Sequence, residues 1–276
     1  MTQTAARPQP SALTPPARHR PGLRTIVVLV VVVALHAVAF VDTEFSLDTL
    51  VRGWRGIVDF FSQALPPDLS WPDIVRPGLS ACLTTFDIGL LGTTLSVPFA
   101  LALAVVGSRT TSASLVAYQA SRWFMSALRA VPEVVYALIF VTAVGLGPFP
   151  GVLALVVHNA GVLGKLWSEA MDEVDRGPVE ALRTNGASRA QVVLHAVFPS
   201  VLPQFLGLLL YRLDVNVRAS LVLGLVGAGG VGFLIDQSVN LFRFDQMVTY
   251  IALVLIMIIA VDVLSAVVRR RVTNTT

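Results

Sequence analysis

The chain has 276 residues, of which 55% are hydrophobic and 13% charged, and its mean hydropathy is +0.74. A soluble domain carries about 25% charged residues, so the composition excludes an ordinary soluble protein. Apolar runs such as IVVLVVVVAL do not alternate as barrel strands do. The sequence therefore predicts an all-α, polytopic transmembrane helical bundle. The net charge of +3 does not indicate a nucleic-acid partner, because the arginines flank the predicted spans.

The N-terminal part is expected to contain an arm, a membrane anchor and an outer segment. Residues 1–22 include PQPSALTPPARHRP, which predicts a disordered cytoplasmic arm. A first transmembrane anchor follows over 23–41, and a cleaved signal peptide is the alternative, because 37–39 resemble a signal-peptidase site. Residues 42–77 are expected to be extracytoplasmic, with an interfacial helix where apolar residues fall on helical spacing.

The rest of the chain predicts a core domain over 78–270 that spans the membrane five more times. The expected spans are about 78–107, 123–146, 150–171, 200–224 and 245–268. Arginines in the arm and the run Arg269-Arg270-Arg271, followed by a tail over 271–276, indicate that both termini are cytoplasmic. Six spans satisfy that topology. The expected location is the cell (plasma) membrane.

The loop over 172–199 then lies in the cytoplasm and reads as two capped helices. Pro178 suits a first helical position, and Glu180 suits the first turn. Gly186 can end the first helix in a left-handed conformation, and Ser188–Gln191 has capping-box spacing. A helix of about eight residues is not stable alone in water. No other sizeable cytoplasmic segment is expected to support it, so it is predicted to dock on a partner; an ordinary loop with two caps is the alternative.

This loop resembles the EAA loop of ABC-importer permeases. The family pattern is E-A-A, three residues, G, nine residues, I, one residue and L-P, and the spacing is intact from Glu180 through Pro199. Three positions depart from the pattern, namely Leu182, Ala196 and Phe198. The resemblance implies a coupling helix that inserts into a groove of a cytoplasmic ATPase. It assigns ATPase coupling to Glu180, Ala181, Leu182, Arg183, Gly186 and Ala187.

The resemblance covers about residues 75–270 and points to the phosphonate-type branch of these permeases, through ALRAVPEVVYALIFVTAVGLG and LYRLDVNVRASLVLGLVGAGGVGF. It implies the type I importer permease fold, which is MetI-like. It also implies a homodimer, a cytoplasmic ABC ATPase dimer and an extracytoplasmic substrate-binding protein as partners. Members of that branch import phosphonates, and some take phosphate or phosphite. The mechanism implied is alternating access.

The chain itself is not expected to be an enzyme or to hold a cofactor. It contains no GxxxxGK[ST] loop, so ATP and Mg would be bound by the partner ATPase. Its four histidines have no metal-site spacing. Three alternatives remain: a permease for methionine or another small nutrient, a secondary transporter with its own ion coupling, and a membrane-embedded hydrolase.

Charged residues inside predicted spans indicate a substrate pathway. An ionisable group within a span faces protein or water, and arginine suits phosphate-like groups through its forked geometry. The segment 211–220 offers Arg212, Asp214, Asn216 and Arg218 as pathway residues. The alternative is structural: Asp214 and Arg218 are four apart and can neutralise each other, and Arg212 can pair with an acid elsewhere.

Three further features have structural interpretations. Arg129 and Glu133 flank Pro132, which is expected to kink its helix, and the two charges are expected to pair. The dipeptide at 158–159 can line the pathway or make an interhelical contact. The glycines at 227–232 match GxGxxG but lie between spans, so close helix packing or a flexible connection is expected there instead of a nucleotide site.

Overall fold

The computed structural model describes residues 22–273, so the predicted arm lies outside the described residues except for Gly22. The chain divides into two compact units, residues 1–58 and 59–276. In the first unit, α1 (Leu23–Asp42) covers the predicted first span, and all its residues are exposed. Helix α2 (Leu47–Ala64) crosses the boundary between the units and contains the predicted amphipathic segment.

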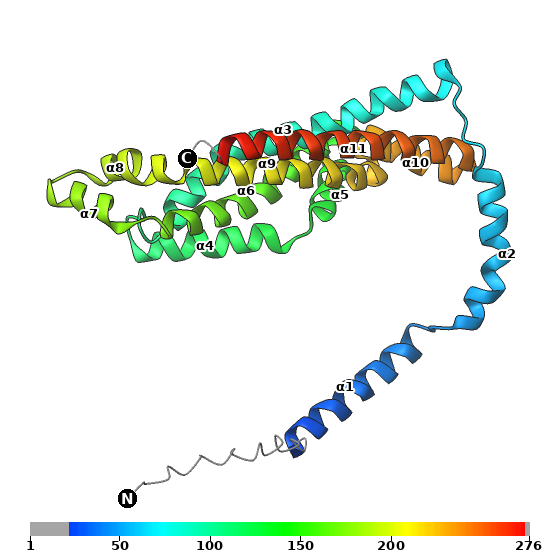
Figure 1. Ribbon diagram of the computed structural model, residues 1–276, viewed down its shortest axis with the longest axis horizontal. Coiled ribbons are helices and arrows are strands. Elements are labelled where there is room, and N and C mark those ends of the chain that lie inside the picture. The colour runs from blue at the N-terminus through cyan, green and yellow to red at the C-terminus, as the bar shows by residue number, and fades with distance from the viewer. Residues whose placement is uncertain (1–21, 274–276) are drawn as a thin grey trace, which may run out of the picture. The chain divides into compact units, whose positions relative to one another are not determined.

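The second unit is a helical bundle, shown in Figure 1. Its elements are η1 (Trp71–Val75), α3 (Arg76–Gly107), α4 (Leu115–Ala130), α5 (Glu133–Val144), α6 (Pro148–Asp172), α7 (Arg176–Thr184), α8 (Arg189–Val192), η2 (Val193–Val197), α9 (Phe198–Leu223), η3 (Gly224–Ala228), α10 (Gly230–Asn240) and α11 (Phe244–Thr273). No strand occurs among residues 22–273. The predicted all-α class is therefore confirmed.

Five stretches are long and apolar enough to cross a membrane: Leu23–Thr49, Trp71–Gly107, Pro148–Asp172, Arg189–Ala228 and Phe244–Val268. The predicted span over 123–146, with its expected kink at Pro132, corresponds to two separate helices. Helices α4 and α5 occupy that region and meet at an angle of 80°, so they make a sixth span only as a broken pair. The cause is Pro132, which holds the preceding Val131 in extended backbone, with ψ of 121°.

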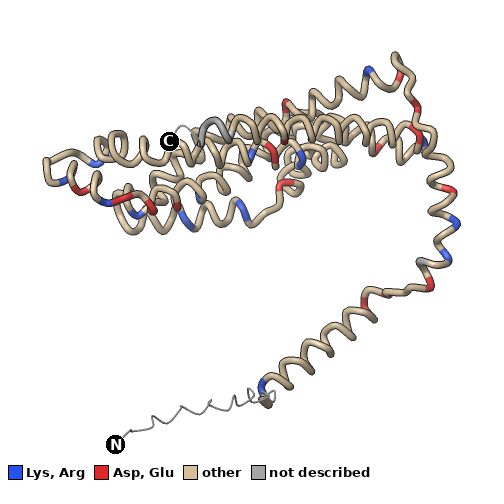
Figure 2. Tube along the Cα trace, in the orientation of Figure 1, with Lys and Arg blue, Asp and Glu red and all other residues tan. Residues whose placement is uncertain are grey.

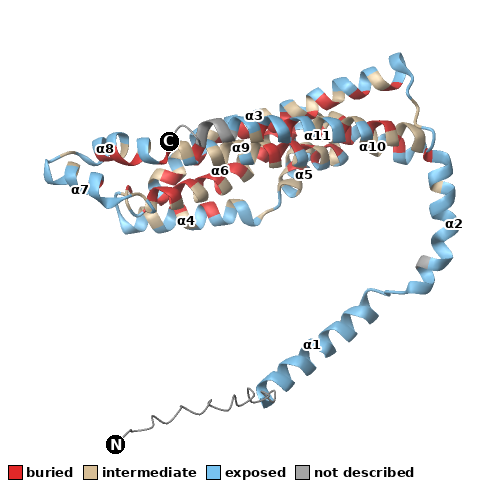
Figure 3. Cartoon of the chain, viewed as in Figure 1, coloured by how far each residue is buried: buried red, intermediate tan, exposed pale blue. Residues whose placement is uncertain are grey.

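Helices α3, α6 and α9 form the centre of the bundle, and most of the buried residues in Figure 3 lie on them. Small residues allow this packing. A Cβ added at Gly92 would lie 2.5 Å from Leu155 Cβ on α6, and one at Gly89 would lie 2.9 Å from the Val217 backbone on α9. These glycines permit the close helix–helix contact that membrane bundles depend on, because lipid supplies no hydrophobic driving force between helices.

The glycine at 92 gives a direct test of this packing. We expect Gly92→Ala to destabilise the bundle by about 1–3 kcal/mol, because a Cβ cannot rotate away as a flexible side-chain end can. The matched control is Gly207→Ala on α9, where an added Cβ meets nothing within 4 Å. The control should be neutral or stabilising, since alanine favours helix. Thermal unfolding of both variants in detergent measures the difference; equal midpoints would contradict the packing argument.

The glycine-rich segment after α9 also packs closely. Helix α10 follows η3 directly, and the Val231 amide donates to Thr85 Oγ1 on α3 at 2.9 Å. A Cβ at Gly232 would collide with the Leu221 carbonyl oxygen. The packing interpretation of this GxGxxG match is confirmed. The segment follows a helix and no strand, so a dinucleotide site has no structural basis here.

One end of the bundle gathers several chain connections. Helices α3 and α6 end there and α4 and α9 begin there, which brings Ser108 next to Asp172. The short helix α7 extends from this end, which we call the α7 end of the bundle. Figure 2 shows a group of charged residues at the α7 end and a second, smaller group within the bundle. The candidate site residues lie in these two groups.

Candidate functional site

Helix α7 begins earlier than the sequence predicted. It starts at Arg176, because the Asp175 side chain caps it by accepting a hydrogen bond from the Gly177 amide at 3.1 Å. Pro178 is therefore the third helical residue and not the first. Glu180 lies beyond the first turn, so its carboxylate is not placed against the positive end of the helix dipole. An acceptor at the N-cap position decides the boundary more strongly than a proline nearby.

The end of α7 and the start of α8 confirm the predicted caps. Gly186 has φ of +77°, and its amide donates to the Arg183 carbonyl at 3.0 Å. The Ala187 amide donates to the Leu182 carbonyl, also at 3.0 Å, which completes a Schellman motif. The capping box at Ser188–Gln191 is present in both directions. The chain thus turns sharply at a glycine between two capped helices.

The expectation that the chain offers α7 no supporting surface is wrong. Val179 is 4% exposed and belongs to a buried cluster with Met171 of α6 and Val197 of η2. Leu182 and Ala187 pack partly against the same cluster. Four of the predicted coupling residues are exposed, namely Glu180, Ala181, Arg183 and Gly186. One face of α7 is therefore held by the bundle, and the opposite face is open.

Two arginines connect this loop to the α3–α4 loop, residues 108–114. Arg183 Nη2 donates to the Thr110 carbonyl at 3.0 Å, and Arg189 Nη1 donates to the Ala113 carbonyl at 2.8 Å. In the α3–α4 loop itself, Arg109 Nε donates to the Tyr118 hydroxyl at 3.1 Å. This bond raises the pKa of Arg109 above its ordinary value. Like any arginine, Arg109 is charged throughout the physiological pH range.

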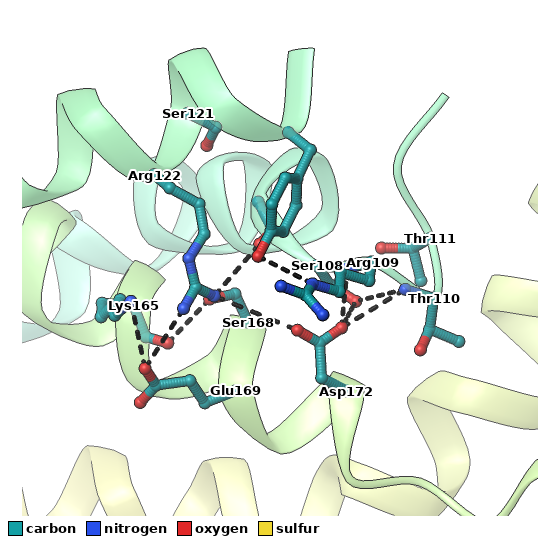
Figure 4. Close-up of polar contacts among 12 residues, drawn as sticks. Ser108, Arg109, Thr110, Thr111, Ser121, Arg122, Lys165, Ser168, Glu169 and Asp172 are labelled. Atoms are coloured by element: carbon teal, nitrogen blue, oxygen red, sulfur yellow. Dashed lines mark hydrogen bonds and ion pairs between the residues drawn. The ribbon is translucent and has the colours of Figure 1, made fainter. Parts of the chain in front are cut away.

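Asp172, the last residue of α6, is the polar centre of the α7 end, and the sequence analysis missed it. Figure 4 shows the carboxylate facing the α3–α4 loop. Its Oδ1 accepts from Ser108 Oγ at 2.7 Å and from the backbone amides of Arg109 at 2.6 Å and Thr110 at 3.3 Å. Arg122 of α4 lies 4.0 Å from Oδ2. The sequence did contain one indication. A carboxylate at a helix C-terminus is repelled by the negative end of the helix dipole, so Asp172 is expected to have a compensating partner outside its own helix.

The second charged group surrounds Arg212, in the middle of α9. Its Nε and Nη2 donate to Asn159 Oδ1 on α6, at 3.0 and 2.5 Å. Nη2 also donates to Asn216 Oδ1 at 3.3 Å, and Asn216 Nδ2 donates to Thr93 Oγ1 on α3 at 2.7 Å. Asn159 and Asn216 are both fully buried. Three membrane helices thus hold this guanidinium by neutral groups.

Arg212 has no acid partner among the described residues. No carboxylate there lies within 4.0 Å of its guanidinium. Its Nη1 makes no hydrogen bond to any described residue, and the Asn159 amide nitrogen is buried without a partner. An arginine has five N–H donors, so donors at this site are left over. Such an arrangement suits an incoming anion.

The other two predicted pathway residues lie elsewhere. Arg218 Nη2 contacts the Asp214 carboxylate, one turn away on α9, and lies 3.9 Å from Asp262 Oδ1 on α11. The expected neutralisation of Asp214 by Arg218 is confirmed. Side chains two positions apart on a helix do not share a face, so Arg212 and Asn216 face α3 and α6 while Asp214 and Arg218 face α11. The four predicted residues do not form one site.

The predicted pair of Arg129 and Glu133 is wrong. No ion pair joins them among the described residues, because the break at Val131–Pro132 places them on different helices. Glu133 Oε2 instead lies 3.7 Å from His158 Nε2 on α6. His158 Nδ1 lies 3.1 Å from the Val131 carbonyl oxygen, so this histidine makes an interhelical contact at the break. The described residues contain no group of three potential metal ligands.

Sequence comparison identifies the family. Residues 96–274 match the family described as "Binding-protein-dependent transport system inner membrane component". The chain belongs to this family. It is a multi-pass inner-membrane permease with the predicted MetI-like fold, and its apolar helices agree with that location.

Two relatives of this permease show the extent of the similarity. It is 39% identical over 250 residues to the phosphite transport system permease protein PtxC of Stutzerimonas stutzeri, which covers 90% of this chain and 88% of the relative. It is 34% identical over 239 residues to the phosphate-import permease protein PhnE of Mycolicibacterium smegmatis, with 87% of this chain and 43% of the relative covered.

Solved structures share the fold of the permease at lower identity. The methionine ABC transporter MetNI in inward-facing conformations matches with a TM-score of 0.62 and 22% identity, over 74% of this chain and 99% of that chain. A bacterial alginate ABC transporter in complex with its pentasaccharide-bound periplasmic protein matches with a TM-score of 0.58 and 16% identity, over 91% of this chain and 96% of that chain. These likenesses confirm the importer permease fold.

Proposed function

We propose that this permease imports phosphorus oxyanions of the phosphite, phosphate and phosphonate class, driven by ATP hydrolysis in a separate cytoplasmic subunit. The single observation that carries the mechanism is the position of α7. It is a short capped helix at one end of the bundle, held by Val179 on one face and open on the other. A partner subunit that binds the open face can move the helices behind it.

The proposed contact with the ATPase uses the exposed face of α7, with Glu180 and Ala181 at its centre. Both are exposed, and Glu180 makes no ion pair with a described residue. Leu182 and Ala187, in contrast, lie partly against the bundle, so their role is to seat the helix. Four of the six predicted coupling residues thus fall into two groups: Glu180 and Ala181 bind the partner, and Leu182 and Ala187 hold α7.

The substrate class follows from the relatives and from Arg212. Relatives that are 34–40% identical to this chain carry the names of phosphite and phosphate transport permeases. A positive group with unused donors in the membrane centre suits oxyanions. In our proposal Arg212 contacts the passing anion, and the buried Asn216 holds the guanidinium in place by accepting a hydrogen bond from Nη2. Asp214 and Arg218, which neutralise each other, shape the helix packing toward α11.

The assembly we propose has two copies of this permease, an ATPase dimer that binds ATP and Mg, and an extracytoplasmic binding protein. This chain holds no cofactor of its own. Both termini and the α7 end face the cytoplasm, as the arginines near each end indicate. The end of α11 lies near the α7 end of the bundle (Figure 1), which agrees with this orientation. Alternating access then moves the bundle around the Arg212 site.

The decisive experiment is purification of the native complex followed by reconstitution into liposomes. We expect an ATPase to co-purify with the permease, and uptake of phosphite or phosphate to require ATP inside the liposome and the binding protein outside. Uptake by the permease alone, driven by an ion gradient, would overturn the proposal. The orientation is tested by inserting a protease site at Asn185 and adding the protease to the outside of intact cells. Cleavage under these conditions would overturn the proposed orientation.

A further inference from the structure

The residues between α3 and α4 are held to α6 by one carboxylate. Asp172 Oδ1 accepts from Ser108 and from two consecutive loop amides. Ser108 is fully buried, and the Asp172 side chain is 24% exposed. Successive backbone amides that point at one anion form a stable concave site. The carboxylate therefore ties the C-terminal ends of α3 and α6 together at the α7 end of the bundle.

The same carboxylate reaches α4 through Arg122. Arg122 Nη1 lies 4.0 Å from Asp172 Oδ2, and Arg122 Nη2 lies 3.5 Å from Glu169 Oε1 one turn earlier on α6. Lys165 lies 3.1 Å from the same Glu169 oxygen. The Arg122 side chain is only 23% exposed, so water screens these contacts less than it screens a surface pair. Figure 4 shows this group of side chains lying between α4, α6 and the loop.

The α7–α8 segment also contacts the α3–α4 loop. By chain connection, α7 is joined to α6 and α8 is joined to α9, but neither is joined to α3 or α4. Arg183 and Arg189 supply the missing connection by donating to the Thr110 and Ala113 carbonyls. The α3–α4 loop is thus bound through both kinds of backbone group: Asp172 accepts from its amides, and the two arginines donate to its carbonyls.

This arrangement matters for the Arg212 site deeper in the membrane. That arginine belongs to α9, while Asn159 belongs to α6 and Thr93 to α3. If α3 and α6 move together relative to α9, the bonds that hold the guanidinium change as one set. If α3 and α6 move separately, either the Arg212–Asn159 bond to α6 or the Asn216–Thr93 bond to α3 changes while the other stays in place. Coordinated motion of α3 and α6 is therefore required for an orderly opening of the site.

We propose that Asp172 is a positioning residue that makes α3, α4 and α6 follow the α7 helix as one rigid body. In this scheme the α3–α4 loop is a second mechanical link between the ATPase-binding helix and the membrane, beside the covalent connection through residues 173–175. When α7 moves, the hydrogen bonds from Arg183 and Arg189 displace the α3–α4 loop. Because Asp172 is bound to the same loop, the ends of α3 and α6 move with it. The inference rests on the proposed function and names residues outside its partner-binding face.

The test compares Asp172→Asn with Glu173→Gln in the reconstituted full complex with binding protein and phosphite. Both variants remove one negative charge at the end of α6, but Glu173 is exposed and its side chain has no hydrogen bond or ion pair among the described residues. The readout is phosphite transported per ATP hydrolysed. We expect this ratio to fall at least about tenfold in Asp172→Asn, because asparagine keeps one neutral acceptor for the loop, loses the negative charge that strengthens these bonds, and places an N–H₂ donor where Oδ2 faces Arg122. The ratio should stay within about twofold in Glu173→Gln.

A second pair of variants, at Arg189, keeps the inference testable if Asp172→Asn fails to fold. Arg189→Gln releases the Ala113 carbonyl without touching the carboxylate, and it should also lower the transported phosphite per ATP. Arg189→Lys keeps a cationic donor and should restore most of that ratio. A purely structural role would lower the yield of assembled complex and leave the ratio in the surviving complex unchanged. An unchanged ratio in Arg189→Gln, or in assembled Asp172→Asn, overturns the inference.

The wild-type complex separates this inference from the proposed function. Failure of the wild type to take up phosphite with ATP would overturn the proposed function itself. Normal wild-type uptake combined with a normal ratio in either Asp172→Asn or Arg189→Gln overturns only the positioning role. Gel filtration of each complex before reconstitution confirms that the ATPase is still bound.

Discussion

Gly186→Pro is expected to abolish ATP-driven uptake while the permease still inserts into the membrane. Gly186 has φ of +77°, whereas proline is confined to about −65°. The substitution also removes the amide that donates to the Arg183 carbonyl. Asn185 has φ of −84° and ψ of 12°, a conformation that a following proline disfavours. The turn between α7 and α8 cannot form, so the open face of α7 is lost as a docking surface.

The measurement is ATPase activity of the reconstituted complex with and without loaded binding protein, alongside uptake. The matched control is Gly186→Asn, because asparagine tolerates the left-handed conformation better than other non-glycine residues; uptake should be largely retained. The charge reversal Glu180→Lys leaves the turn intact and should also abolish coupling through the exposed face of α7. Normal stimulation of the ATPase in Gly186→Pro would refute the role of α7.

Arg212→Gln is expected to lower uptake at least about tenfold without destabilising the protein. An ionised side chain at the membrane centre costs at least ~2.5–3.5 kcal/mol on insertion scales, and Arg212 has no carboxylate partner among the described residues to offset that cost. Glutamine keeps an N–H₂ donor for the Asn159 oxygen, so removal of the charge alone should leave the unfolding temperature unchanged or raise it. Loss of uptake with unchanged or higher stability is the signature of a residue retained for function at a cost in stability.

Uptake assays and thermal unfolding of the same preparations measure the two effects of this variant together. Phosphite binding to the separate binding protein serves as a control and should not change. The comparison is the double variant Asp214→Asn, Arg218→Gln, which replaces an ion pair by a neutral hydrogen-bonded pair and should retain most uptake. If the double variant loses uptake and Arg212→Gln does not, the pathway assignment is reversed.

Much of the fold follows from local patterns. Apolar run length predicts the helices, because only a helix of about 20 residues crosses lipid with its backbone satisfied. The turn at Gly186 and the capping box at Ser188–Gln191 were predicted because each depends on a few neighbouring residues. The kink at Pro132 follows from its missing amide, although its 80° angle does not. The start of α7 was placed wrongly because two signals, Asp175 and Pro178, compete within one turn.

The sites depended more on tertiary contacts. The sequence grouped four polar residues of one segment into a single set: Arg212, Asp214, Asn216 and Arg218. The sequence shows that these residues are close along one helix, but it does not show which neighbouring helix each side chain contacts. Packing against α6 gives Arg212 the amide oxygen of Asn159, and packing against α11 gives Arg218 a second acid. Only the bundle decides which buried charge is neutralised and which is left for a ligand.

The amino-acid sequence by itself determined the class of this protein, its main helices, and the turn and capping box between α7 and α8, since these depend on composition and on residues close along the chain. The tertiary structure alone decided that α7 rests on the bundle through Val179 and that Asp172 joins the ends of α3 and α6. The atoms in the second contact belong to residues 64 apart in sequence, Ser108 and Asp172. No local periodicity links such positions, because their meeting depends on how whole helices pack.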